Sequence, residues 1–144
     1  MRCLRNLSKT SLSEAVRILG WACVMPILKR AIPLQTLVRL VRRTGGRHRD
    51  GVREDQIVTF ARWACRITRW SSGGNCLERG LIAYRFLGAI NAQPTLVVGI
   101  GRGEGAMRGH AWVVIDGRPV GEHPATLGEY TPVLTFGPDG SRLG

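Results

Sequence analysis

The chain has 144 residues, of which 44% are apolar and 22% charged, a composition typical of one folded globular domain and not of a disordered chain. Its net charge is +11, and the whole excess lies in residues 1–75, which hold 15 Lys/Arg against 4 Asp/Glu, whereas residues 76–144 hold 6 of each. The four cysteines form no Cys-x-x-Cys pair and no Cys/His ligand spacing, which argues against a structural metal or a disulfide framework. We therefore expect a protein of the reducing cytoplasm that uses neither a metal nor another cofactor.

The first part of the chain, residues 1–52, is apolar and basic. Its apolar pattern is interrupted at Pro26 and Pro33, which predicts two or three short helices because proline ends or kinks a helix. The longest uncharged run, Ile18–Leu28, is far shorter than the about 20 residues that span a bilayer. The positive charge suggests a peripheral contact with an anionic membrane or a partner protein, and the simpler alternative is a solvated basic face. No nucleic-acid-binding motif is present, so we expect no specific nucleic-acid partner.

The second part, residues 53–144, changes from helical to strand patterning. It follows an arginine-rich loop in which His48 has the setting of a solvated surface group. A helix is predicted from Arg53 to about Trp70, with Cys65 close to its apolar stripe and therefore in the core. A second helix begins at Cys76, after a glycine-rich turn.

Strands follow the second helix. Four are predicted, with a glycine-rich loop at residues 101–109 after the first and a tight turn around Asp116 after the second. Helices that precede antiparallel strands indicate an α+β fold, in which residues 1–52 and 53–144 pack together as one compact domain. The predicted strands are Gln93–Gly99, His110–Ile115, Pro119–Glu122 and Tyr130–Phe136.

Cys76 is placed where a cysteine can be a nucleophile. Asn75 is a suitable N-cap, whose side-chain oxygen would accept a backbone N–H of the first helical turn. Cys76 then occupies the first helical position, where the helix dipole and the free N–H groups favour a thiolate. Many cysteine hydrolases prepare their nucleophile in this way. The alternative is a small buried apolar residue that happens to begin a helix.

A cysteine nucleophile needs a base, and His110 at the start of a strand is the candidate. The base in turn needs an orienting acid, for which Asp116 and Glu122 compete. Asp116 lies about 20 Å along an extended strand from His110 and already has a role in the turn. A three-residue turn would place Glu122 diagonally across from His110 on the same face, whereas a two-residue turn would bring His123 opposite His110. We favour Glu122 as the third residue.

An oxyanion formed at a cleaved carbonyl needs hydrogen-bond donors. The backbone N–H of Cys76 is one, and the side chains of Asn75 and Trp70 are candidates for another. The alternative for Trp70 is aromatic packing. Arg79, one turn after Cys76, would bind an acid or a substrate carboxylate, or remain a surface charge.

These residues resemble a known family over about residues 55–144. The match comprises the start of the second helix and a specific run on the predicted hairpin, with supporting similarity at Ala61–Arg69 and Tyr130–Phe136. It resembles the transglutaminase-like cysteine proteases of lasso-peptide biosynthesis, and more specifically the short stand-alone form of the lasso B leader peptidase. The sequences that carry it are Cys76-Leu77-Glu78-Arg79 and the run His110-Ala111-Trp112-Val113-Val114-Ile115-Asp116-Gly117-Arg118-Pro119-Val120-Gly121-Glu122.

The resemblance implies a papain/transglutaminase-like core with the catalytic Cys76 at a helix N-terminus packed on an antiparallel sheet. Its task would be to cleave the leader from a ribosomally made lasso precursor peptide, delivered by a separate leader-binding protein and closed afterwards by a macrolactam cyclase. The acid of this family is often Asp, so Glu122 differs in residue type. The alternative functions are acyl transfer to an amine on the same triad, or a basic binding module without catalysis.

Overall fold

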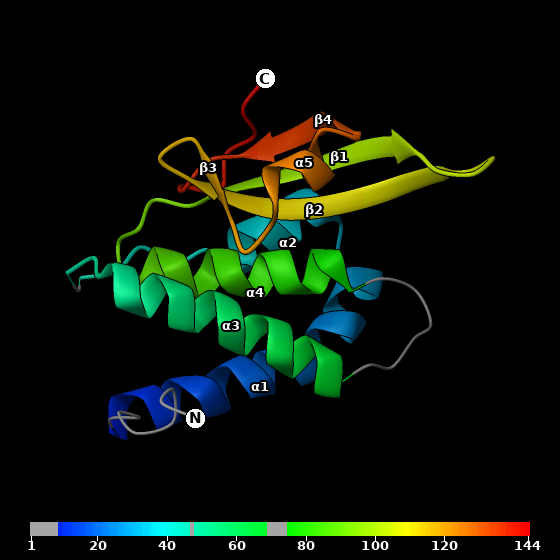
Figure 1. The fold of residues 1–144 in the computed structure, drawn as a ribbon. Helices are drawn as coiled ribbons and strands as arrows, with labels where there is room; N and C mark the ends of the chain where they lie inside the picture. Colours follow the sequence, from blue (N-terminus) through cyan, green and yellow to red (C-terminus); the bar gives the residue numbers. More distant parts are fainter. Residues whose placement is uncertain (1–8, 47, 69–74) are drawn as a thin grey trace.

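The structure is a computed structural model and describes residues 9–46, 48–68 and 75–144 (Figure 1). Helices come first and strands last, as predicted, with one short helix between the last two strands. Trp70 lies outside the described residues. The elements are α1 (Lys9–Ala31), α2 (Leu34–Val41), α3 (Gly51–Ile67), α4 (Cys76–Ala89), β1 (Thr95–Arg102), β2 (Met107–Ile115), β3 (Arg118–Val120), α5 (Pro124–Leu127) and β4 (Tyr130–Phe136).

The four strands form one antiparallel sheet in the order β3-β2-β1-β4. Figure 1 shows α1 to α4 stacked on one face of this sheet, with α4 next to the strands and α1 farthest from them. The α+β prediction is confirmed. The core side chains come from α1 to α4 and from three strands, and the largest fully buried ones include Ile18, Leu37, Ile57, Tyr84 and Phe136.

Helix α1 corrects the prediction that Pro26 interrupts a helix, since it runs unbroken from Lys9 to Ala31 with Pro26 inside it. A proline in a helix leaves the carbonyl four residues earlier without its usual N–H partner. That carbonyl belongs to Ala22, and the hydroxyl of Thr68, at the end of α3, lies 3.5 Å from it. The hydroxyl of Thr68, which has a single proton to donate, lies closer to the carbonyl of Ala64, at 2.9 Å, so the contact with Ala22 is a weak one. Ala22 and Met25, just before the proline, are buried in the core, and such tertiary packing is not visible in the periodicity of one segment. Pro33 does separate two helices and precedes α2.

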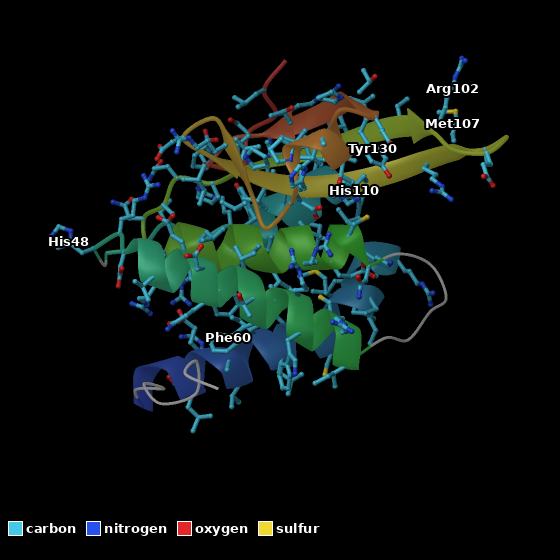
Figure 2. All side chains as sticks on the ribbon, in the orientation of Figure 1. His48, Phe60, Arg102, Met107, His110 and Tyr130 are labelled. Atoms are coloured by element: carbon cyan, nitrogen blue, oxygen red, sulfur yellow. The ribbon has the colours of Figure 1, made fainter. Side chains whose placement is uncertain are left out.

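The β1–β2 hairpin is longer than predicted. Residues 101–109 were expected to be a loop, but pairing continues to Arg102 and Met107, and only residues 103–106 form the turn. Glycine suits this hairpin because a Cβ on Gly101 would lie 2.7 Å from the carbonyl oxygen of Glu129. Figure 2 shows Arg102 and Met107 at the far end of the hairpin. Among the described helices, none is long and apolar enough to cross a membrane.

Candidate active site

Cys76 is the first residue of α4, as predicted, and is half-buried. Asn75 precedes it at the N-cap position, but its side chain does not cap the helix. Instead, Asn75 Nδ2 donates a 2.6 Å hydrogen bond to the carbonyl of Cys65 near the end of α3. The expected role of Asn75 as a side-chain acceptor is therefore wrong, and its side chain bonds to α3 as a donor instead. The bond anchors the start of α4 to α3.

A buried ion pair anchors the same end of α4 to α1. Glu78 is 5% exposed and pairs with Lys29, while its Oε2 atom has no hydrogen-bond partner among the described residues. Burial, and then the charge of Glu78, raise the pKa of the Cys65 thiol to about 11. Cys65 therefore stays protonated at neutral pH and belongs to the core, as predicted.

An open cleft lies at the N-terminus of α4, and Cys76 and His110 both line it. Its remaining walls come from the start of α4, the first half of β2 and the first residue of β4. The cleft thus brings together residues that are 34 positions apart in the sequence. The other lining residues are Asn75, Arg79, Arg108, Gly109 and Tyr130.

The imidazole of His110 is held by two aromatic rings and faces a carboxylate. The ring of Tyr130 stacks on it at 4.9 Å between centroids, and the ring of Trp112 lies at 5.9 Å. Figure 2 shows His110 and Tyr130 next to each other on the sheet. His110 Nε2 is buried and lies 3.5 Å from Glu122 Oε1, an ion-pair distance without hydrogen-bond geometry. Because Glu122 occupies the Nε2 side, Nδ1 is the nitrogen left to face a thiol.

The turn before Glu122 differs from the one we favoured. Ile115 pairs with Arg118, so the loop contains two residues, Asp116 and Gly117, both with left-handed backbone angles (φ 50° and 73°). Such a loop is the usual two-residue hairpin connection. Asp116 is exposed and pairs with Arg49 at 2.7 Å, which raises the pKa of the Arg49 guanidinium. Asp116 therefore lies at the hairpin tip and does not contact His110.

Glu122 reaches His110 by leaving the ladder. If the β2–β3 register continued, Glu122 would face Ala111, on the other side of the sheet from His110. The ladder ends at Val120, however, and Gly121 adopts a left-handed conformation with φ 71°. At Gly121 the chain turns toward the helices and leaves the sheet. Glu122 therefore does not pair with Ala111, and its side chain approaches His110 instead.

Two arginines hold this turned segment. Arg62 of α3 donates to the carbonyl of Gly121, and Arg79 of α4 forms an ion pair with Glu122 Oε1. Glu122 is therefore shared between Arg79 and His110, at the first turn of the helix that carries Cys76. A two-residue turn with a continued register would have brought His123 opposite His110. His123 is instead exposed, and its Nδ1 accepts from the N–H of Ala125 at the start of α5.

Sequence reasoning did not assign two side chains, those of Tyr130 and Arg108, to the cleft. Tyr130 was recognised only as the start of a strand, and Arg108 as part of a loop. Tyr130 pairs with Gly101 in the sheet, which places its ring beside that of His110. No local pattern signals such a contact, because it depends on the order in which the strands assemble.

A family model described as the transglutaminase-like superfamily matches residues 12–135. A match over most of the chain shows that the protein belongs to this superfamily, whose members are usually cysteine-based enzymes. The superfamily includes cysteine peptidases and acyl-transferases. Comparison with curated proteins gives no match, and neither does comparison with solved structures.

Proposed function

We propose that the protein is a cysteine peptidase that cleaves the leader from a lasso-peptide precursor, with Cys76, His110 and Glu122 as its triad. The observation that carries this proposal is the arrangement of the cleft. Cys76 begins a helix on one wall, and His110 lies on the other with Glu122 at 3.5 Å. The resemblance of the hairpin run to lasso leader peptidases supports the choice of substrate.

The proposed reaction has two halves, formation of a thioester on Cys76 and hydrolysis of that thioester. His110 takes the proton of the Cys76 thiol, the sulfur attacks the scissile carbonyl, and the imidazolium returns the proton to the departing amine. A water molecule then attacks the thioester while His110 accepts its proton, which releases the leader and restores the thiol. The N–H of Cys76, at the first turn of α4, would donate to the oxyanion formed during attack. Asn75 also lines the cleft, and one of the two N–H groups of its Nδ2 donates to the carbonyl of Cys65.

Glu122 would act on His110 rather than on the substrate. A carboxylate at the Nε2 side fixes the ring orientation and stabilises the imidazolium formed during attack. Arg79 moderates this effect, because it shares the same carboxylate oxygen. We therefore expect Glu122→Gln to lower kcat by at least about tenfold with little change in KM.

The test incubates the protein with lasso precursor peptides, each supplied with its leader-binding protein, and follows the products by mass spectrometry. We expect release of the leader with an unmodified C-terminal carboxylate. Cys76→Ala should abolish release, whereas Cys23→Ala, which alters an exposed cysteine on α1, should not. A Cys76→Ala protein that still releases the leader would refute the proposal.

Acyl transfer is the competing function, because the superfamily includes enzymes of that type. The same incubation with an added primary amine separates the two. A peptide whose mass includes the amine would show that an amine, not water, resolves the thioester. Clean hydrolysis at millimolar amine supports the peptidase. The leader-binding protein and the macrolactam cyclase remain the proposed partners, and omission of the first and addition of the second test them.

A further inference from the structure

A second cavity lies at the opposite end of α4 from Cys76. It is enclosed by α1, by the beginning of α3, by the last turn of α4 and by the segment between α2 and α3. Its volume is about 330 Å³, which is at the lower end of the range for small-molecule sites. We call it the arginine cavity, because four arginines line it: Arg17, Arg43, Arg53 and Arg85.

The positive charge of this cavity is mostly uncompensated. Glu14 is the one carboxylate among its described lining residues, and it pairs with Arg53 at 3.1 Å. Arg17 and Arg43 are exposed and form no ion pair within the described part of the chain. Three positive charges thus converge on one hollow without an anion to balance them.

Arg85 has no anionic partner among the described residues and is affected by the positive charges around it. Its guanidinium donates to the carbonyl of Val41 at 3.0 Å and stacks over the ring of Trp21 at 4.3 Å, so neither partner is an anion. Burial lowers the pKa of Arg85, and repulsion from Arg43 and then Arg17 lowers it further. A bound anion would relieve this repulsion.

The wall that carries Arg43 is fixed in place. The N–H of Gly45 donates to the carbonyl of Gly88 at 3.0 Å, which ties the segment after α2 to the last turn of α4. Arg85 adds a second tie through Val41, the last residue of α2. These two ties fix the walls of the cavity, which Arg17 and Arg43 line as exposed residues.

We propose that the arginine cavity binds a phosphate monoester group. Guanidinium groups bind phosphate oxygens through paired N–H donors, and three uncompensated charges suit a dianion better than a single carboxylate. The phosphate would belong to a phosphorylated small molecule or to a lipid headgroup of the same chemistry. The site is independent of the cleft, because the two lie at opposite ends of α4.

The first experiment titrates inorganic phosphate into the full-length protein by calorimetry at constant ionic strength, with chloride as the balancing anion. The test variant is Arg17→Gln/Arg43→Gln. The matched control is Arg66→Gln/Arg118→Gln, which removes the same charge from two exposed arginines that line no described cavity. We expect saturable binding that weakens at least about tenfold in the test variant and stays within about twofold in the control. No saturable binding, or equal weakening in both variants, would overturn the proposal.

The second experiment identifies the source of the phosphate. Vesicles with phosphatidic acid are compared with phosphatidylserine vesicles of equal surface charge in a flotation assay. A lipid source predicts that the test variant loses the preference for phosphatidic acid and that inorganic phosphate competes for it. If wild type and both variants float equally with the two lipids, the phosphate titration stands and assigns the cavity to a soluble phosphorylated molecule. Cys76 alkylation should be unchanged in the test variant, so failure here is distinct from failure of the peptidase proposal.

Discussion

Gly121 is the residue that turns the chain so that Glu122 meets His110, and replacing it tests that geometry. A Cβ at position 121 would overlap Val58 Cγ1 of α3, and the left-handed φ of 71° disfavours any L side chain. Holding alanine at this left-handed φ costs about 1 kcal/mol, and the overlap with Val58 costs about 1–3 kcal/mol. Gly121→Ala should therefore lower the free energy of unfolding by about 2–4 kcal/mol.

Gly117 provides the matched control. It has nearly the same backbone angle, φ 73°, but a Cβ there would meet nothing within 4 Å. Gly117→Ala should therefore cost only the conformational term of about 1 kcal/mol. Urea denaturation compares the two variants, and Val58→Ala in the Gly121→Ala background should recover part of the difference.

The functional consequence is measured as the alkylation rate of Cys76. Gly121→Ala displaces the neighbouring Glu122 and should slow alkylation by iodoacetamide at pH 7, whereas Gly117→Ala should leave the rate unchanged. Equal stability losses in the two variants, or a normal Cys76 rate in Gly121→Ala, would show that the turn at Gly121 does not place the acid.

Other consequences concern the interior. Lys29→Met leaves the Glu78 carboxylate buried without its partner, so urea denaturation should show a loss of about 2–3 kcal/mol, and adding Glu78→Gln should restore most of it. Burial raises the pKa of Tyr84 to about 12, so the folded state keeps this proton to higher pH than the unfolded chain does. The stability that this raised pKa of Tyr84 contributes is complete below about pH 10 and is lost as the pH rises toward 12. At pH 11 the loss in the free energy of unfolding amounts to about 1.4 kcal/mol. Tyr84→Phe should flatten that part of the stability–pH curve, and an unchanged slope would contradict the assignment.

Local pattern was sufficient for much of the chain. Cys76 begins its helix as predicted, because the glycines before it in the sequence and the apolar spacing after it are signals within one segment. The strand Tyr130–Phe136 has the predicted bounds for the same reason. The α+β order followed from the change of periodicity along the chain.

The deviations arise where a distant residue overrides a local rule. Pro26 does not end α1, because Ala22 and Met25, just before it, are buried in the core that α1 shares with the other helices. Asn75 does not cap α4, and its amide donates instead to the carbonyl of Cys65 on α3. Glu122 was selected through a three-residue turn that does not form, and it reaches His110 through the left-handed Gly121 instead. Each depends on a contact between segments, which periodicity and turn preference do not encode.

The central claim is that the fold activates one particular thiol. Peptide mapping by mass spectrometry after timed iodoacetamide treatment at pH 7 gives the alkylation rate of each cysteine. Cys23, which is exposed and does not line the cleft that holds His110, serves as the internal reference. We predict that Cys76 reacts faster than Cys23 although it is less exposed, and that His110→Ala slows Cys76 at least about tenfold without affecting Cys23. Equal rates at the two cysteines, or a Cys76 rate that does not depend on His110, would contradict the account.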